Sequence, residues 1–128
     1  MAGLRLPITF TQLHYYKKLK NYYNMLTLLK KVFGSNQPVN FKELTEKGAV
    51  IVDVRTVAEF KTGHLKDAVN MPLDTISGQL QKIKKINKPV ITVCRSGSRS
   101  GVATNILKKE GIEAYNGGAW DILKRKIT

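Results

Sequence analysis

Residues 94–100 read Cys-Arg-Ser-Gly-Ser-Arg-Ser, and these residue types together suit a sulfur nucleophile. Cys94 is the only cysteine in the 128-residue chain, and it follows the apolar run at 90–93. A helical pattern begins near Gly101, so we expect the thiol at the carboxyl end of a strand, facing the start of a helix. Converging backbone N–H groups and the helix dipole favour negative charge at such a place. The thiolate that results is the reactive form of cysteine.

The other residues of this loop supply further means of holding an anion. Gly97 can take a positive φ angle or allow close backbone approach. The serine hydroxyls add donors to a nest of backbone N–H groups, and the arginines are forked, permanently charged donors suited to an oxyanion. The predicted site is therefore Cys94 as catalytic nucleophile, with a substrate-binding loop formed by Arg95, Ser96, Gly97, Ser98, Arg99 and Ser100.

A buried apolar cysteine is the common alternative for a lone thiol. We reject it because two arginines and a glycine have no reason to surround a core sulfur, and we expect Cys94 to be exposed to solvent. Arg99 fits substrate binding better than a plain surface position, whereas Arg95 fits both equally. Asp53 and Arg55 could support the site by orienting the loop, although a structural ion pair or helix cap fits them better.

Composition is that of an ordinary soluble domain. A single cysteine excludes an internal disulfide framework and a dithiol mechanism, and it fits a reducing compartment. His14 and His64 lie far apart with no cysteine cluster near either, so we expect no metal site and no cofactor. No stretch approaches the roughly 20 apolar residues of a membrane span. We therefore expect a soluble, cytoplasmic protein.

The net charge of +13 is unevenly spread, because residues 1–42 hold seven of the 22 Lys and Arg residues and none of the nine acidic ones. A basic surface can attract nucleic acid, anionic lipid or small anions. We interpret it as a solvated basic face, and we expect no nucleic-acid partner.

Hydrophobic spacing predicts one amphipathic helix over residues 12–33, with an apolar stripe formed by Leu13, Tyr16, Leu19, Tyr23, Leu26, Leu29 and Phe33. We expect this stripe to pack on a neighbouring surface or on a second copy of the chain rather than on a membrane, with a fully disordered extension as the third option. Residues 34–38 then form a linker. The chain thus divides into a basic extension and linker at 1–36 and one domain at 37–128.

Met25 is a plausible chain start, so residues 1–24 could be an extension from an upstream start codon or from cloning. The mass of the protein from its native source tests this hypothesis, because a mass that includes residue 1 would reject it.

Helical and strand patterns alternate after the linker. Apolar, β-branched runs predict strands at 49–54, 68–71, 89–93 and 112–115. A glycine pair at 117–118 is expected to turn the chain after the last of them. Helical patterns lie at 41–47, 56–61, 74–85 (interrupted at Gly78), 100–110 and 119–126. This alternation predicts an α/β fold with a mostly parallel sheet of about five strands and helices on both faces.

The loop at 94–100 resembles the Cys-x-x-Gly-x-Arg-Ser active-site loop of the rhodaneses, the thiosulfate sulfurtransferases. Two further regions resemble the signatures of this family. The amino-terminal signature is matched by Asp53-Val54-Arg55, Glu59-Phe60, Gly63-His64-Leu65 and residues 68–72. The carboxyl-terminal turn is matched by Asn116-Gly117-Gly118 with Trp120. Their order and spacing carry the resemblance over about residues 37–126.

The resemblance implies a rhodanese-like fold and a two-step sulfur relay. The Cys94 thiolate would attack the outer sulfur of thiosulfate or of another small anionic sulfane donor, release sulfite and carry a persulfide. Cyanide or a low-molecular thiol would then accept the outer sulfur. Arg99 and Arg95 would hold the sulfonate of the donor.

Two other functions fit the same loop. Cysteine phosphatases and arsenate reductases use a Cys-x5-Arg loop, but only four residues separate Cys94 from Arg99. The smaller loop suits a sulfane sulfur better than a tetrahedral phosphate. The second alternative is a carrier that takes persulfide from a protein donor and passes it to a protein acceptor, with the basic helix as its docking element.

Overall fold

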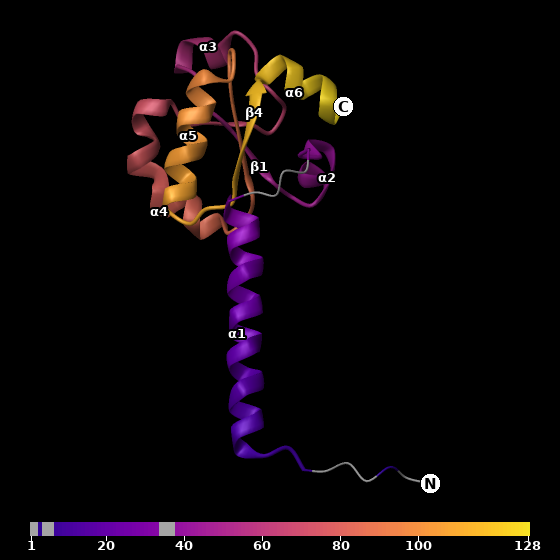
Figure 1. Ribbon diagram of the computed structural model, residues 1–128. Coiled ribbons are helices and arrows are strands. Elements are labelled where there is room, and N and C mark those ends of the chain that lie inside the picture. Colours follow the sequence, from indigo (N-terminus) through magenta and orange to yellow (C-terminus); the bar gives the residue numbers. More distant parts are fainter. Residues whose placement is uncertain (1–2, 4–6, 34–37) are drawn as a thin grey trace. The chain divides into compact units, whose positions relative to one another are not determined.

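A computed structural model describes residues 3, 7–33 and 38–128 (Figure 1). Its contacts divide the chain into two units, residues 1–35 and residues 36–128. The predicted linker at 34–38 lies, apart from Pro38, outside the described residues. Within the described part of the chain, no helix has both the length and the apolar content that crossing a membrane requires.

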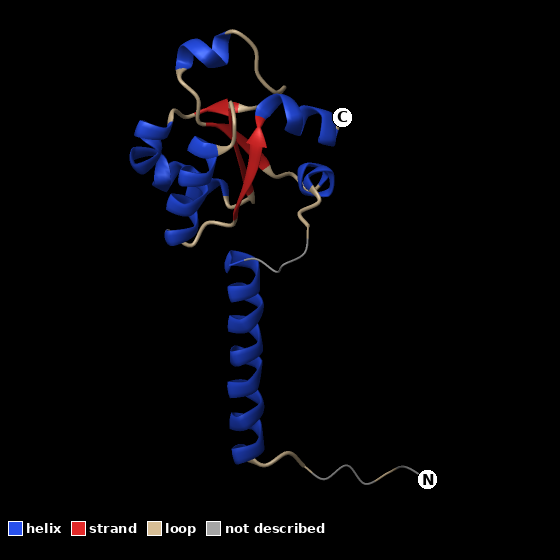
Figure 2. Cartoon of the chain, turned by 45° about the horizontal axis from the view of Figure 1, so that its top comes forward, coloured by secondary structure: helices blue, strands red, loops and turns tan. Residues whose placement is uncertain are grey.

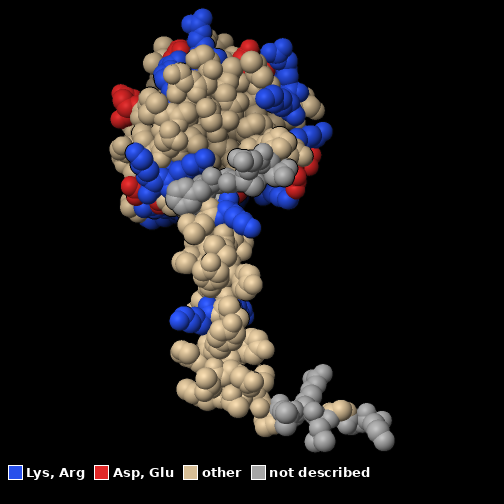
Figure 3. Space-filling model, in the orientation of Figure 1, with Lys and Arg blue, Asp and Glu red and all other residues tan. Residues whose placement is uncertain are grey.

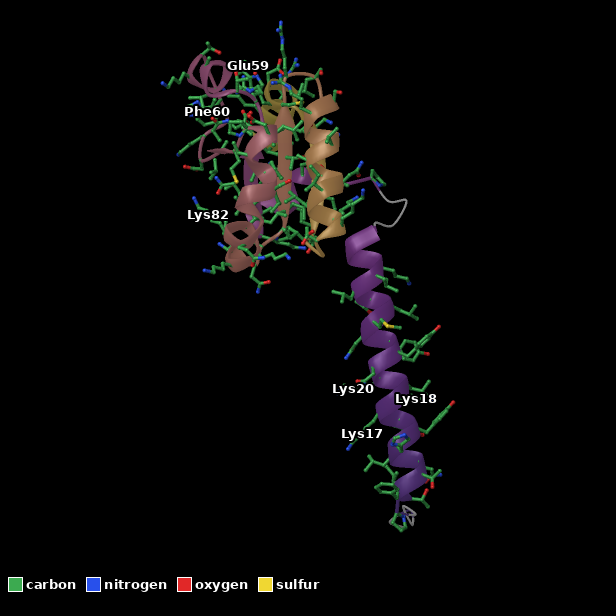
Figure 4. The ribbon with its side chains drawn as sticks, turned by 90° about the vertical axis from the view of Figure 1, so that its left-hand side faces the viewer. Lys17, Lys18, Lys20, Glu59, Phe60 and Lys82 are labelled. Atoms are coloured by element: carbon green, nitrogen blue, oxygen red, sulfur yellow. The ribbon has the colours of Figure 1, made fainter. Side chains whose placement is uncertain are left out.

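The amino-terminal unit contains the helix α1 (Phe10–Phe33). It begins before the predicted residue 12 because Thr9 and Gln12 cap each other. The Gln12 backbone N–H donates to Thr9 Oγ1 at 3.3 Å, and the Thr9 N–H donates to Gln12 Oε1 at 3.1 Å. This reciprocal pair is a capping box. Basic side chains project from α1 (Figures 3 and 4), among them Lys17, Lys18 and Lys20.

A parallel sheet lies at the centre of the second unit, with strand order β2-β1-β3-β4. Its strands are β1 (Val50–Asp53), β2 (Val69–Asn70), β3 (Val90–Cys94) and β4 (Ala114–Ala119). We expected about five strands, mostly parallel. The described residues form four, all parallel, because the sequence supplies four β-branched or small-residue runs between its helices.

Helices cover both faces of this sheet (Figure 2). They are α2 (Phe41–Glu46), α3 (Val57–Lys61), the 3₁₀ turn η1 (Leu73–Thr75), α4 (Ile76–Ile86), α5 (Ser98–Lys109) and α6 (Trp120–Ile127). Alternate strand residues point to opposite layers. Val52 and Val90 pack in the core with α4 and α5, whereas Ile51 and Ile91 pack in the core with α2 and α6. Both layers are therefore apolar, as a buried parallel sheet requires.

Two helix predictions need correction at their boundaries. The segment predicted as one helix from residue 74 contains η1 and then α4, and α4 runs through Gly78 without interruption. The predicted helix at 100–110 starts earlier, since α5 begins at Ser98. Gly97, with a φ of 97°, ends the preceding loop in the left-handed region and lets the helix start directly after it.

The carboxyl-terminal strand differs most from the prediction. We expected a strand that ends at Tyr115 and a turn at Gly117-Gly118, but β4 continues through both glycines. Its register skips one residue, because Thr92 pairs with Asn116 and Val93 pairs with Gly118. Gly117 is therefore the extra residue of a β-bulge.

A side chain would not fit at the bulge. A Cβ at Gly117 would lie 2.8 Å from Ile91 Cγ2 and 3.0 Å from the carbonyl oxygen of Thr92. This close approach of β4 to β3 brings the end of β4 beside the Cys94 loop.

Candidate active site

Cys94 is the last residue of β3, and α5 begins at Ser98, so only residues 95–97 connect strand and helix. Such a short connection needs a residue with positive φ, and Gly97 supplies it. A Cβ at Gly97 would also lie 3.3 Å from Gly118 Cα of the neighbouring strand. The glycine is thus required both by the turn and by the contact with β4.

Three donors or acceptors surround Cys94 Sγ. The Gly97 N–H donates to Sγ at 3.0 Å and the Ser100 N–H at 3.4 Å, while Ser100 Oγ lies 3.4 Å away. Burial by itself raises the pKa of the Cys94 thiol. Hydrogen bonds from the Ser100 side chain and from the backbone of Ser100, Ser96 and Gly97 outweigh burial, so the pKa lies below its ordinary value. The loop therefore favours the thiolate.

Cys94 is fully buried, which contradicts our expectation that it would be exposed. The loop closes over the sulfur because the backbone donors of Gly97 and Ser100 converge on it. Apolar side chains of the core, including Val52 and Val54, cluster with Cys94. The residue is thus neither an exposed thiol nor a purely apolar core cysteine, and a reactant reaches Sγ only after the side chain or the loop moves.

The remaining loop residues differ in how far they are exposed to solvent. Arg95, Ser96 and Ser98 are exposed, Gly97 and Arg99 are half-buried, and Ser100 is fully buried. The predicted binding residues are therefore gathered in one short segment, but they differ in their access to solvent.

Arg99 is paired with an acidic residue that the sequence reasoning did not assign to the site. Its Nη1 and Nη2 donate to the two carboxylate oxygens of Glu59, each at 2.8 Å. Glu59, labelled in Figure 4, also accepts from the N–H and hydroxyl of Thr56, both at 2.9 Å. Hydrogen bonding to Arg99 holds the pKa of the Glu59 carboxyl well below its usual range. The only sequence signal for Glu59 was its place in the Glu59-Phe60 segment.

Asp53 and Arg55 form a buried ion pair at the end of β1. Arg55 Nη2 donates to Asp53 Oδ2 at 2.7 Å, and its Nε lies 3.0 Å from both carboxylate oxygens. The guanidinium also donates to the carbonyl oxygens of Gly63 at 2.7 Å and Glu59 at 3.4 Å, and it stacks over Trp120. The pair therefore anchors the backbone of the α3 region, which carries Glu59, to the end of the sheet.

Asn116 of β4, which the sequence does not indicate as a site residue, also contacts the Cys94 loop. Its Oδ1 accepts from Ser100 Oγ at 2.7 Å and from the Gly118 N–H at 3.0 Å, and its Nδ2 donates to the Gly97 carbonyl oxygen at 3.0 Å. The only sequence signal was its position before the glycine pair.

The chain also matches known proteins. Residues 37–122 match the family model described as "Rhodanese-like domain". The uncharacterized protein YqhL of Bacillus subtilis is 39% identical over 69 residues, covering 53% of this chain and 54% of YqhL. The chain thus spans about half the length of that relative.

Two further relatives agree with that match. The thiosulfate sulfurtransferase GlpE of Pseudomonas savastanoi pv. phaseolicola is 34% identical over 74 residues, covering 58% of this chain and 69% of GlpE. A crystal structure of a rhodanese-like domain protein from Staphylococcus aureus superimposes with a TM-score of 0.57 at 32% identity, covering 66% of this chain and 86% of that one. These likenesses confirm the predicted α/β fold class.

Proposed function

Because the chain belongs to the rhodanese-like domain family, we propose that it is a sulfurtransferase that moves sulfane sulfur through a persulfide on Cys94. The donor is thiosulfate or a persulfide, and the acceptor is a thiophile such as cyanide or a thiol. Relatives named as sulfurtransferases, including GlpE, support transfer of sulfur in general. The single observation that carries the proposal is the set of hydrogen-bond donors around Cys94 Sγ.

The reaction proceeds in two balanced steps. The Cys94 thiolate attacks the outer sulfur of thiosulfate, a new S–S bond forms, and the bond between the two thiosulfate sulfurs breaks. The electron pair of that bond leaves with sulfite. Cyanide then attacks the outer sulfur of the persulfide, which yields thiocyanate and restores the thiolate. This is covalent nucleophilic catalysis, and it needs no general base if the loop already holds the thiolate.

The hydrogen-bond donors of the loop can stabilise both the thiolate and the persulfide of Cys94. The Gly97 and Ser100 N–H groups stabilise negative charge on Sγ before attack, and the same loop can accept the outer sulfur of the persulfide. Arg99 would hold the sulfonate of thiosulfate through those of its five N–H groups that Glu59 does not engage. Arg95, exposed on the loop, would add positive charge to the approach.

The burial of Cys94 adds a requirement to this mechanism. Since Sγ has no solvent contact, the donor must displace residues 95–97 or await rotation of the Cys94 side chain. The connection is short and its outer residues, Arg95 and Ser96, are exposed, so it can move without disrupting the core. We therefore expect sulfur loading to be slower than attack on a freely exposed thiolate.

A thiosulfate-to-cyanide assay with the wild-type chain and Cys94→Ser tests the proposal. The wild type is expected to form thiocyanate and, after incubation with thiosulfate alone, to gain about 32 Da, one sulfur atom, in intact-mass measurement. Cys94→Ser should show neither, since the chain has no other cysteine. Equal thermal unfolding midpoints would show that the variant is folded. No mass gain from thiosulfate or from a low-molecular persulfide would overturn the proposal.

A protein-to-protein persulfide carrier is the alternative that the basic helix α1 favours. A chain that gains one sulfur but forms no thiocyanate would support this carrier role over the enzyme. Deleting residues 1–33 should then leave sulfur loading unchanged and weaken transfer to a protein acceptor. Hydrolysis of an aryl phosphate, with no mass gain from thiosulfate, would instead support a phosphatase.

A further inference from the structure

The orientation of the Asn116 amide is fixed by two backbone groups of opposite character. The Gly97 carbonyl oxygen can only accept a hydrogen bond, so it must face Asn116 Nδ2. The Gly118 N–H can only donate, so it must face Oδ1. With Oδ1 an acceptor, Ser100 Oγ at 2.7 Å must be the donor in the contact between them.

The Ser100 hydroxyl therefore has one proton and two acceptors. One acceptor is Asn116 Oδ1 at 2.7 Å, and the other is Cys94 Sγ at 3.4 Å when the cysteine is a thiolate. A hydroxyl donates only one hydrogen bond. With a thiol present, the hydroxyl can point to Asn116 while the S–H group donates to Ser100 Oγ. Formation of the thiolate favours turning the hydroxyl toward the sulfur.

The surroundings allow the hydroxyl to turn while everything else stays in place. The carbonyl oxygen of Ser100 accepts from Thr104 Oγ1 at 2.8 Å and lies 2.9 Å from Thr92 Oγ1, so the Ser100 backbone is held. Asn116 Oδ1 keeps the Gly118 N–H as a donor after the hydroxyl leaves. Neither orientation leaves a buried polar group without a partner, which would otherwise be costly.

The bulge of β4 is what places Asn116 in this position. Asn116 pairs with Thr92 at the last regular register before the extra residue Gly117. Bulges re-aim neighbouring side chains, and here Gly117 fits only because it has no Cβ. The Asn-Gly-Gly sequence thus brings an exposed amide to the buried pair of Ser100 and Cys94.

We propose that Asn116 is a positioning residue that competes with Cys94 for the proton of the Ser100 hydroxyl and so sets how readily the sulfur ionises. The competition keeps a larger share of the resting cysteine in the thiol form. The inference rests on the proposed role of Cys94 as the nucleophile, but it concerns ionisation alone and can be measured without any sulfur donor.

Alkylation of Cys94 by iodoacetamide as a function of pH tests this inference, with intact mass as the readout. Asn116→Leu removes the competing acceptor, so the apparent pKa of the thiol should fall by about one unit, a tenfold change in thiolate fraction below the midpoint. Asn116→Asp keeps an acceptor and adds negative charge, so the apparent pKa should rise. A purely structural role would move both variants in the same direction.

Two controls separate competition from general loosening of the fold. The first control is Asn70→Leu, which removes the hydrogen bonds that Asn70 Nδ2 donates to the carbonyl oxygens of Asp53 and Arg55. This variant should leave the apparent pKa of the Cys94 thiol unchanged. In a Ser100→Ala background, which removes the shared proton, Asn116→Leu should have no further effect. Comparing the two single variants with the double variant, a double-mutant cycle, isolates the coupling between Asn116 and Ser100.

The results overturn the inference if Asn116→Leu leaves the apparent pKa unchanged or raises it, or if its effect persists in the Ser100→Ala background. Because Asn116 is exposed, the variants are expected to fold, and their thermal midpoints are measured alongside. A chain that shows the expected alkylation shifts but no sulfur loading would contradict the proposed function while supporting the role of Asn116.

Discussion

Arg99 of α5 and Glu59 of α3 form a two-bonded ion pair although they lie 40 positions apart in the chain. The arginine that we propose for the sulfonate of a donor therefore already has an anionic partner. Glu59 is itself held by Thr56, so it does not readily move aside. A fixed carboxylate beside the binding site opposes a doubly charged anion. The pair thus sets how strongly the site attracts thiosulfate.

Glu59→Gln should lower the KM for thiosulfate about two- to fivefold with little change in kcat, because a solvent-screened carboxylate opposes the anionic donor only modestly. Gln preserves the capping box with Thr56, so α3 should remain intact. Glu110→Gln, which removes a somewhat more exposed ion pair with Lys84, serves as the control and should leave the KM unchanged. A rise in KM for Glu59→Gln would mean that Glu59 positions Arg99 rather than competing with the donor.

The same carboxylate should make the domain sensitive to acid. The pKa of Glu59 is lower in the folded state than its unfolded value of about 4.3. A group with a depressed folded pKa stabilises the fold above the unfolded pKa, and the stabilisation is lost as pH falls. The wild type should therefore unfold at a higher urea concentration than Glu59→Gln near pH 6, and this difference should shrink as the pH falls to about 3. An advantage that stays constant over this range would contradict the depressed pKa.

The alternation of elements and the position of the loop could be read from the sequence because both depend on local signals. The β-branched run at 90–93 predicts a buried strand, and Cys94 and Gly97 mark its end and the following turn. The start of α1 was missed by two residues for an equally local reason, the overlooked capping pair of Thr9 and Gln12.

Other features depend on contacts between distant segments, and no local pattern reveals them. The sequence predicts a turn at Gly117 because glycine is typical of turns, whereas the close approach of Ile91 and Thr92 requires a glycine there. The burial of Cys94 results from donors that converge on it after folding. The partner of Arg99 lies on another helix, so the sequence indicated a free arginine.

Ionisation of Cys94 should make the stability of the fold depend on pH. Its pKa is depressed in the folded state because loop hydrogen bonds outweigh burial, and the ordinary value is about 8.5. The resulting stabilisation is fully present above the unfolded pKa and is lost as pH falls through the folded one. Relative to Cys94→Ser, the wild type should gain in urea unfolding midpoint as pH rises toward the unfolded pKa of about 8.5, in the presence of reductant. A difference that narrows toward high pH would show that burial dominates.

Gly117→Ala should be among the most destabilising single changes in the domain. Its Cβ would meet Ile91 Cγ2 at 2.8 Å and Val93 Cγ1 at 3.0 Å, and the backbone oxygen of Thr92 cannot give way without breaking the ladder. Overpacking of this kind costs about 1–3 kcal/mol. The strain would also displace Asn116, so sulfur transfer should fall even where the protein remains folded.

Gly78→Ala is the matched control for that substitution. Gly78 is exposed within α4, and no heavy atom lies within 4 Å of an added Cβ. Alanine in a helix interior is favoured over glycine by roughly 0.5–1 kcal/mol, so this variant should be slightly more stable than the wild type. Urea unfolding of both variants provides the measurement. If Gly117→Ala were no less stable than Gly78→Ala, the bulge would not have the tight packing on β3 from which the placement of Asn116 follows.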